Sequence, residues 1–203
     1  MRARKGPHLR RSISLPMRNH SESVIWLTGI SGSGKSTISS ATVSYLREAG
    51  HSVFSIDGDV LRQGLSNDLS FSAEDRLENM RRAAEVAYLT SSQGLVTVVS
   101  MISPSAEARA LVRRLVRHGK FVQVFVDTPL ALAEARDVKG LYKQARAGQI
   151  SNFTGIGATY ERPTDSEIVI DTSQVSALEA AERIVCYVRE QYGVGCTTPA
   201  LLD

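Results

Sequence analysis

The sequence predicts an α/β protein in which helices cover both faces of a central, doubly wound parallel sheet of about five strands. Short apolar runs alternate along the chain with longer segments of helical periodicity, and this alternation is typical of parallel strands joined by crossover helices. The runs are apolar at nearly every position, which indicates strands buried on both faces. A length of 203 residues suits one domain better than two.

Five apolar runs are expected to form the strands, at residues 24–28, 52–56, 95–99, 121–126 and 168–170. Four segments with helical periodicity are expected to form the helices, at residues 35–48, 73–92, about 104–118 and 174–191. Gly50 and Gly94 follow the first two helices, where glycine favours a helix end. Ser72 precedes the second helix and is a good N-cap residue.

The alternation of strands and helices is interrupted at residues 137–166. This stretch is rich in Gly, Lys, Arg and Thr, contains Pro163 and has no long apolar periodicity. A loop of such length inside a compact domain is usually functional. We therefore expect a lid at about residues 137–160, within one domain that spans residues 22–192 and is followed by a C-terminal tail at residues 193–203.

The positive charge of the chain is concentrated at its N-terminus. The net charge is +3 and the pI is about 9.0, but residues 1–20 contain six Lys or Arg residues and no acidic residue. The remainder has 18 basic and 21 acidic residues, which argues against nucleic acid as a partner of the folded domain. We expect residues 1–21 to form a basic, solvated and disordered arm. An arm that touches RNA or another anionic surface is the alternative.

The same features predict a protein of the cytoplasm. No apolar run is long enough to span a membrane, so no membrane partner is expected. The basic arm lacks the apolar segment of a secretory signal, and the remnant of a transit peptide is the alternative. Cys186 and Cys196 lack the spacing of metal ligands, and Cys186 falls in an apolar helical pattern that predicts a core position.

A phosphate-binding loop follows the first predicted strand. Residues Gly29-Ile30-Ser31-Gly32-Ser33-Gly34-Lys35-Ser36-Thr37 contain the pattern G-x-x-x-x-G-K-S between a strand and a helix. Glycines let the backbone wrap a phosphate closely, and the N–H groups and helix dipole attract the anion. Lys35 supplies charge to the β- and γ-phosphates, and Ser36 presents its hydroxyl to Mg²⁺. The residues expected to contact the nucleotide are Gly29, Ser31, Gly32, Ser33, Gly34, Lys35, Ser36 and Thr37.

Such a loop occurs in switches, motors and kinases, so by itself it predicts nucleotide binding and not a reaction. The chain is short for most motors. The N-K-x-D motif with which GTPases read guanine does not occur in the sequence. A small-molecule kinase of the P-loop NTPase-like class, dependent on ATP and Mg²⁺, remains.

Two carboxylates follow the second predicted strand, in the segment Asp57-Gly58-Asp59. In a doubly wound sheet the carboxyl ends of the strands form the crevice in which ligands bind. Carboxylates placed there can order the water ligands of Mg²⁺ or accept a proton from an attacking hydroxyl. Asp-Gly is also common in ordinary turns, and the residues alone leave this interpretation open.

Several arginines follow the carboxylates, at Arg62, Arg76, Arg81 and Arg82. Guanidinium groups donate in pairs to the oxygens of phosphate or sulfate. The spacing places part of the set formed by Arg76, Asn79, Arg81 and Arg82 on one helix face. Any one of these arginines, taken alone, is more simply interpreted as a solvated surface residue.

Over about residues 22–172 the chain resembles the adenylylsulfate kinase family. The matching segments are Ile25-Trp26-Leu27-Thr28-Gly29, the phosphate-binding loop, Asp57-Gly58-Asp59 with Arg62, Phe71-Ser72-Ala73-Glu74-Asp75-Arg76, Glu78-Asn79, Arg81-Arg82, Ile102-Ser103-Pro104 and Phe125-Val126-Asp127-Thr128-Pro129. They continue with Arg136-Asp137-Val138-Lys139-Gly140-Leu141-Tyr142-Lys143, Ala145-Arg146-Ala147-Gly148 and Asn152-Phe153-Thr154-Gly155-Ile156. The last of these segments are the most specific.

The resemblance implies a reaction and its partners. Enzymes of this family use ATP to phosphorylate the 3′-hydroxyl of adenosine 5′-phosphosulfate (APS). The product is 3′-phosphoadenosine 5′-phosphosulfate (PAPS), the sulfuryl donor made in sulfate assimilation. ATP and Mg²⁺ are thus the implied cofactors, APS is the implied substrate, and a homodimer is the implied assembly.

The resemblance also implies roles for individual residues. Asp59, or else Asp57, would activate the 3′-hydroxyl and help to order Mg²⁺, and Lys139 of the lid would add charge at the transferring phosphoryl group. Phe71 and Phe153 would stack on the two faces of the adenine, although core packing is the simpler interpretation of both. The implied catalytic set is Asp57, Asp59, Lys35 and Lys139. The other residues implied in substrate binding are Arg62, Arg76, Asn79, Ile102, Ser103, Leu141 and Thr154.

Four positions depart from the family pattern, near the expected sulfonucleotide pocket. Val60 stands where Asn is usual, Ser70 where Gly is usual, Ser105 where Tyr is usual, and Gly157 where an acidic residue is common. One alternative is therefore a related kinase that acts on another 5′-substituted nucleotide, such as a nucleoside diphosphoramidate. A second alternative, a nucleotide-binding regulatory subunit without catalysis, is disfavoured by the intact phosphate-binding and carboxylate residues.

Overall fold

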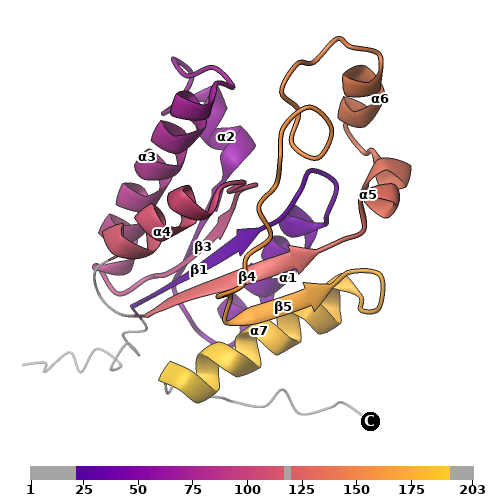
Figure 1. Ribbon diagram of the computed structural model, residues 1–203. Coiled ribbons are helices and arrows are strands. Elements are labelled where there is room, and N and C mark those ends of the chain that lie inside the picture. The colour runs from indigo at the N-terminus through magenta and orange to yellow at the C-terminus, as the bar shows by residue number, and fades with distance from the viewer. Residues whose placement is uncertain (1–21, 117–119, 193–203) are drawn as a thin grey trace, which may run out of the picture.

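The computed structural model describes residues 22–116 and 120–192, which form a five-stranded parallel sheet with helices on both faces (Figure 1). The strands lie in the order β2 (Val53–Asp57), β3 (Val96–Ser100), β1 (Ser23–Thr28), β4 (Phe121–Asp127) and β5 (Ile168–Asp171). Neighbouring strands are parallel throughout. The predicted α/β fold is confirmed. The arm predicted at residues 1–21 and the tail predicted at residues 193–203 lie outside the described residues.

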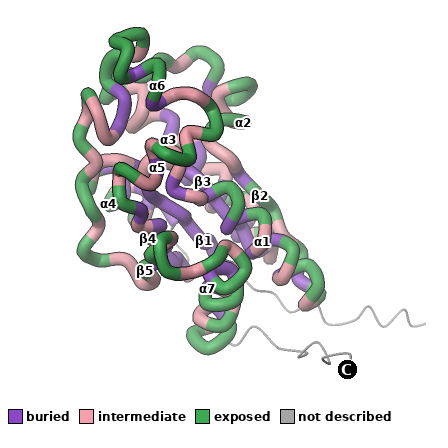
Figure 2. Tube along the Cα trace, turned by 90° about the vertical axis from the view of Figure 1, so that its right-hand side faces the viewer, coloured by how far each residue is buried: buried purple, intermediate pink, exposed green. Residues whose placement is uncertain are grey.

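Two helical layers bury the sheet. The longer helices are α1 (Lys35–Glu48), α3 (Ala73–Ser91), α4 (Ala106–Leu115) and α7 (Ala177–Tyr192). Alternate residues of β1 point to opposite faces, so Ile25 and Leu27 pack towards α1 and α7, whereas Val24 and Trp26 pack towards α3 and α4. Figure 2 shows the buried residues, in purple, concentrated along the strands between these layers. Each buried aliphatic side chain contributes about 1.5–3 kcal/mol, so these two layers supply most of the stability.

Side-chain caps mark where α3 and α4 begin. The Ser72 hydroxyl accepts a hydrogen bond from the backbone N–H of Asp75 at 3.1 Å, and α3 starts at the next residue, as predicted. Ser105 caps α4 in the same way, by accepting from Ala108 at 3.2 Å. Because Ser105 itself is extended, α4 begins later than the expected residue 104.

Three short helices in the described part of the chain were not predicted. They are α2 (Gly58–Gln63), α5 (Leu130–Arg136) and α6 (Leu141–Arg146). Each is too short to show helical periodicity, and two depend on carboxylate caps. The Asp57 carboxylate accepts from Asp59 N–H at 2.9 Å, and the Asp137 carboxylate accepts from Tyr142 and Lys143 N–H at 3.0 Å.

The outer face of α7 corrects one expectation. Its buried residues include Ala180, Ile184 and Val188, which recur every fourth position and face the sheet. Cys186 lies two positions from Ile184 and is exposed, so its predicted core position was wrong. None of the helices within the described ranges has the length and apolar character needed to cross a membrane.

The segment expected to form the lid has a small apolar core of its own. Ala133 of α5 and Tyr142 and Ala145 of α6 pack with Phe153. Figure 1 shows α5 and α6 standing beyond the carboxyl edge of the sheet, above the loop that follows β1. The lid cluster thus lies next to the phosphate-binding loop and not in the main core.

Candidate active site

Close backbone packing shapes the loop between β1 and α1. Gly29 and Gly32 have φ angles of 154° and 71°. A Cβ at Gly29 would lie 2.5 Å from the carbonyl oxygen of Val126, and one at Gly32 would lie 2.8 Å from that of Ala133. Only glycine fits these two positions. The loop therefore has the compact form that turns backbone N–H groups towards a phosphate.

Lys35 is buried at the start of α1, with 8% of its surface exposed. Its ammonium group donates to the carbonyl oxygen of Ile30 at 2.7 Å and to the Ser33 hydroxyl at 3.3 Å. Burial lowers the pKa of Lys35 to about 8, although the carboxylate of Asp59 acts in the opposite direction. A bound phosphate would stabilise the charged form, so nucleotide binding and protonation of this lysine are coupled.

Asp57 joins the phosphate-binding loop to the segment that follows β2. One carboxylate oxygen accepts from the Ser36 hydroxyl at 3.0 Å, and the other accepts from the N–H of Asp59 at 2.9 Å. Both oxygens of Asp57 thus accept hydrogen bonds, one from Ser36, which is the residue expected to hold Mg²⁺, and one from the first turn of α2. Mg²⁺ commonly binds through one or two side-chain oxygens together with phosphates and water, and Ser36 with Asp57 fits that pattern.

Asp59 faces the lid. Its carboxylate forms an ion pair with the ammonium group of Lys139. Both side chains are more than half exposed, so water solvates each charge whether or not the ion pair forms. The structure therefore brings together the four residues implied as catalytic, since Asp57 and Asp59 also act electrostatically on Lys35.

The acceptor side is built around Phe71 and two arginines. The guanidinium of Arg62 lies 4.3 Å from the centre of the Phe71 ring, and that of Arg76 lies 6.0 Å from it. Arg76 also donates to the Thr154 hydroxyl and to the Asn152 carbonyl oxygen, both at 2.6 Å. Burial lowers the pKa of both arginines from the ordinary value, and the proximity of Arg62 contributes at Arg76. Arg76 therefore ties α3 to the far end of the lid segment.

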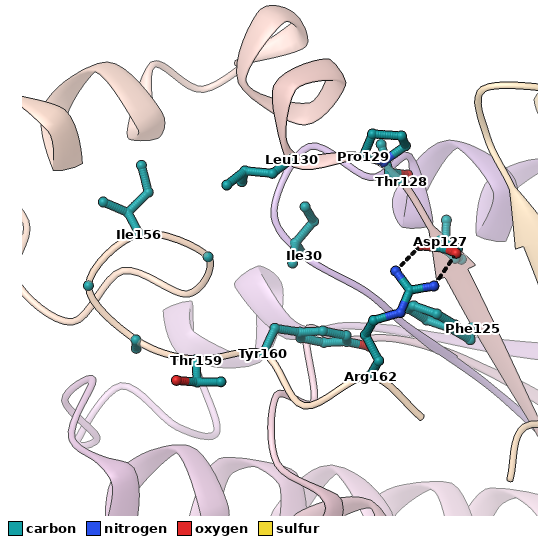
Figure 3. A pocket seen from close by; sticks show the side chains of 14 residues that line it. Ile30, Phe125, Asp127, Thr128, Pro129, Leu130, Ile156, Thr159, Tyr160 and Arg162 are labelled. Carbon is teal, nitrogen blue, oxygen red and sulfur yellow. Dashed lines mark hydrogen bonds and ion pairs between the residues drawn. The ribbon is translucent and has the colours of Figure 1, made fainter. Parts of the chain in front are cut away.

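Two cavities flank residues Ala158 and Thr159, which line both. The cavity of about 330 Å³ is lined by Phe71, Arg76 and Asn152 together with residues of α3 and α4. The cavity of about 470 Å³ lies against the phosphate-binding loop and is drawn in Figure 3. Figure 3 shows Ile30, Leu130 and Ile156 around its open space, with Tyr160, Phe125 and the Asp127–Arg162 ion pair along one side.

Other residues implied in substrate binding are engaged within the protein. Phe153 is 8% exposed and meets Tyr142 edge-on, with ring centres 5.0 Å apart, and Leu141 packs against the same lid cluster. Ser103 is buried, and its hydroxyl accepts from Trp26. Asn79 is buried too, but its side-chain oxygen has no hydrogen-bond partner among the described residues. Such an atom is costly to bury without a partner, and it fits a group that would receive a ligand hydrogen bond.

Arg81 and Arg82 have structural partners. Arg81 pairs with Glu78, and Arg82 pairs with both Glu78 and Asp68. These contacts lower the pKa of Glu78 to about 2, chiefly through the hydrogen bonds from the two arginines. Arg82 therefore braces α3 against the loop after α2, and Arg81 pairs with glutamates of α3 itself, which matches the simpler interpretation of both residues.

Lid residues without a predicted role reach the phosphate-binding loop. The Tyr142 hydroxyl donates to the carbonyl oxygen of Ser31 at 2.8 Å. Arg136 donates to the carbonyl oxygen of Thr172 at 3.0 Å and approaches that of Gly32 at 3.5 Å. Only tertiary structure brings these pairs together, and no local pattern in the sequence indicates them.

The fold and this site define a P-loop kinase: a parallel sheet, a glycine-rich loop with a buried lysine, and a lid that places a second lysine on a carboxylate. A family model for adenylylsulphate kinase matches residues 21–171. The chain therefore belongs to the adenylylsulfate kinase family, as the resemblance predicted.

Individual relatives agree with this assignment. An adenylyl-sulfate kinase of Bacillus pumilus is 50% identical over 173 residues, which cover 85% of this chain and 88% of that protein. The Mycobacterium tuberculosis APS kinase CysC, solved in complex with AMPPNP and APS, superposes with a TM-score of 0.80 at 44% identity, over 83% of this chain and 97% of that one. A hexameric APS kinase from Thiobacillus denitrificans gives a TM-score of 0.63 at 27% identity, over 86% of this chain and 30% of that one.

Proposed function

We propose that this chain transfers the γ-phosphoryl group of ATP to the 3′-hydroxyl of APS and so produces PAPS and ADP. The observation that carries the proposal is the meeting of Lys35, Asp57, Asp59 and Lys139 beside the phosphate-binding loop. The names of the relatives support APS as the acceptor. In such transfers the protein contributes mainly positioning and charge stabilisation, and this site has groups for both.

The ATP end would be held by the backbone of the loop and by Lys35. The residues proposed to contact ATP are Gly29, Ser31, Gly32, Ser33, Gly34, Lys35, Ser36 and Thr37. Ser36 would be the protein ligand of Mg²⁺, with Asp57 and Asp59 acting through water. Bound there, Mg²⁺ would neutralise charge on the phosphate oxygens.

The hydrogen bonds of the two aspartates separate their roles. Both oxygens of Asp57 accept hydrogen bonds, one from the Ser36 hydroxyl and one from the N–H of Asp59, so Asp57 is suited to orienting the metal site. Asp59 forms its ion pair with the exposed ammonium group of Lys139 and is suited to acting as the base. When the γ-phosphate attracts Lys139, Asp59 is released to accept the proton of the 3′-hydroxyl. The 3′-oxygen then bonds to the γ-phosphorus, and the bond to the β-phosphate oxygen breaks with its electron pair on ADP.

The acceptor would lie between α3, the turn after β3 and the lid. Arg62 and Arg76 would bind the phosphosulfate, because guanidinium groups pair with such oxygens, and the unpartnered oxygen of Asn79 would accept a ligand hydrogen bond. Phe71 is 63% exposed and free to stack on the adenine. Phe153 would complete the sandwich only if it turned from the lid cluster towards the nucleotide. Ile102, Ser103, Leu141 and Thr154 would contribute the remaining walls.

The departures from the family pattern favour a second candidate only at one position. Ser70 binds Asp75, Ser105 caps α4, and a Cβ on Gly157 would crowd Asn152 at 3.2 Å, so these three have local structural roles. Val60 is 63% exposed beside Asp59 and has no such role among the described contacts. A related acceptor, such as a nucleoside diphosphoramidate, is therefore retained on the strength of Val60.

An ADP-release assay with Mg-ATP tests the proposal. The acceptors are APS, AMP, CMP and cytidine diphosphoramidate, and turnover restricted to APS is expected. Turnover of another acceptor alone would keep the kinase and replace the substrate. Lys35→Ala should abolish turnover, and absence of turnover in the unaltered protein with every acceptor would favour the regulatory subunit.

The assembly, location and domain limits remain predictions. We propose a homodimer, while one solved relative is described as hexameric, and light scattering of the purified protein decides between them. Dependence on ATP favours the cytoplasm, which cell fractionation tests. A kinase domain at residues 22–192 with a lid at about 137–160 is supported by the lid cluster, which is separate from the two apolar clusters that flank the sheet.

A further inference from the structure

Arg109 of α4 is a buried guanidinium without a carboxylate partner. It is 4% exposed, and none of the ion pairs among residues 22–116 and 120–192 includes it. One terminal nitrogen donates to the carbonyl oxygen of Ser103 at 2.9 Å, whereas Nε has no partner among the described residues. Burying a charge without an opposite charge opposes folding. Stability of the fold therefore does not explain the presence of Arg109 at this buried position.

The residue that Arg109 binds is strained. Ser103 has a φ angle of 49°, in the left-handed region that is unfavourable for residues other than glycine. Such a conformation persists only where surrounding contacts over-determine it. Ser103 follows β3 at the carboxyl edge of the sheet, and the preceding carbonyl, of Ile102, accepts from the N–H of Gly29 at 3.3 Å. The strained turn thus lies directly beside the phosphate-binding loop.

Donors from two elements hold this turn. Trp26 and Thr28 of β1 donate to the Ser103 hydroxyl at 2.9 Å and to the Ile102 carbonyl oxygen at 2.7 Å. Both are fully buried in the central strand and cannot move far. Arg109 donates to the Ser103 carbonyl oxygen from the other side at 2.9 Å, whereas the Thr28 hydroxyl reaches the same oxygen at 3.3 Å. Arg109 lies on α4, whose Ala108 lines the cavity at Phe71 together with Pro104 and Ser105. It is therefore the contact through which α4 controls the turn.

Tyr160, at the end of the segment expected to form the lid, contacts the same group. Its hydroxyl lies 2.9 Å from the Thr28 hydroxyl, and the Arg109 guanidinium lies 5.9 Å from the centre of its ring. An aromatic face attracts a cation at that distance, which partly offsets the missing carboxylate. Burial raises the pKa of Tyr160 to about 12, so the ring stays neutral at physiological pH. Figure 3 shows Tyr160 at the edge of the cavity beside the phosphate-binding loop.

We propose that Arg109 is a positioning residue for the acceptor: it holds the Ile102–Ser103 turn in its left-handed conformation and so sets the wall against which the sulfonucleotide binds. This role presupposes the kinase activity proposed above. Without the bond from Arg109, Ser103 would relax towards a favoured backbone conformation and move the wall. The Ile102 carbonyl oxygen that accepts from Gly29 is held by Thr28 and not by Arg109, so the ATP end would be unaffected.

The kinetic test compares Arg109→Met, Arg109→Lys and the control Arg114→Met, which removes an exposed arginine of the same helix. Arg109→Met should raise KM for APS about ten-fold or more, as expected for loss of a hydrogen bond from a charged donor. KM for ATP should stay within about two-fold in the same variant. Arg109→Lys should lie between the native enzyme and Arg109→Met, and Arg114→Met should match the native enzyme. An unchanged KM for APS, or equal rises in both KM values, would overturn the role.

A spectroscopic test does not depend on turnover. Trp26 is the only tryptophan of the chain, and its indole N–H binds Ser103, so its emission reports on the turn. Arg109→Met should shift the emission maximum of the folded protein, and Arg114→Met should leave it unchanged. If Arg109→Met does not fold, Arg109→Lys supplies the comparison. An unshifted spectrum in the folded variants would reject the positioning role, whereas absence of APS turnover in the native protein would reject only the proposed function.

Discussion

The Lys139 ammonium pairs with the Asp59 carboxylate, although the two residues are 80 positions apart in the chain. Lys139 lies between the short helices of the lid, and Asp59 lies in α2, directly after β2. The pair therefore links the segment expected to form the lid to the carboxyl edge of the sheet. It also places the proposed base close to where the 3′-hydroxyl would arrive.

Replacing Asp59 should affect chemistry, whereas replacing Asp57 should affect the metal. Asp59→Asn is expected to lower kcat by roughly 100-fold or more, the usual contribution of a general base, with little change in KM for ATP. Asp57→Asn should mainly raise the Mg²⁺ concentration needed for half-maximal rate. Steady-state kinetics with varied Mg²⁺ checks both. A larger loss of kcat in Asp57→Asn at saturating Mg²⁺ would exchange the two roles.

Lys35→Met should stabilise the nucleotide-free protein while abolishing its activity. Burial lowers the pKa of Lys35 to about 8 from an ordinary value of 10.5. Between these pH values the unfolded chain holds a proton that the folded protein lacks, so the free energy of unfolding rises with pH in this window. Below pH 8 the buried charge opposes folding by at most about 3 kcal/mol.

Urea denaturation of the native protein and Lys35→Met, at pH 7 and at pH 10, measures this effect. Lys35→Met should be the more stable protein at pH 7 by about 1–3 kcal/mol, and the difference should shrink at pH 10. Lys143→Met, which removes an exposed lysine of α6, is the control and should leave the free energy of unfolding at pH 7 near the native value. A difference for Lys35→Met that is equal at both pH values would contradict the assigned burial cost.

Removing the Tyr142 hydroxyl should weaken the contact between lid and loop. Tyr142→Phe loses the hydrogen bond to the Ser31 carbonyl oxygen and should lower kcat several-fold. Tyr45→Phe loses a comparable bond, to Glu182 on α7, far from the site and is the matched control. Each variant should lose at most about 1 kcal/mol of stability. Equal effects of the two variants on kcat would show that the hydrogen bond from Tyr142 to Ser31 makes no specific contribution to catalysis.

Arg76 and Arg82 should respond differently to the same substitution. Arg76→Lys is expected to raise KM for APS about ten-fold, because lysine cannot reproduce the paired donors that reach the lid and the proposed phosphosulfate. Arg82→Lys should instead lower the free energy of unfolding and leave KM for APS near the native value, since Arg82 braces α3 through Asp68 and Glu78. Kinetics and urea denaturation on both variants distinguish a ligand contact from a structural one.

Much of the fold could be predicted because it follows from local patterns. The central strands β1, β3 and β4 are buried on both faces and are apolar at most positions, whereas the edge strands β2 and β5 are partly exposed. Ser72 caps α3 through the N–H of a residue three positions away. The short helix α6 depends on Asp137, whose carboxylate reaches N–H groups across a glycine with a positive φ angle. Six helical residues carry too little periodicity to reveal it.

The residue types of the site were predictable, but the partners of most side chains were not. The loop and Asp57-Gly58-Asp59 follow directly from motifs. The bond of Asp57 to Ser36 depends on β2 ending beside α1, and the bond of Asp59 to Lys139 depends on where the lid meets the sheet. The burial of Ser103 and the isolation of Arg109 have no counterpart in local sequence.

The sequence by itself determined the class of fold, the phosphate-binding chemistry and the family. All three depend on spacings of a few residues, and such spacings determine local backbone structure directly. Only the tertiary structure decided which aspartate pairs with the lid, which arginines have carboxylate partners and which residue holds the strained turn. These outcomes depend on contacts between segments tens of residues apart. The free energy of burial and charge pairing at such contacts is set by packing and not by neighbours in the chain.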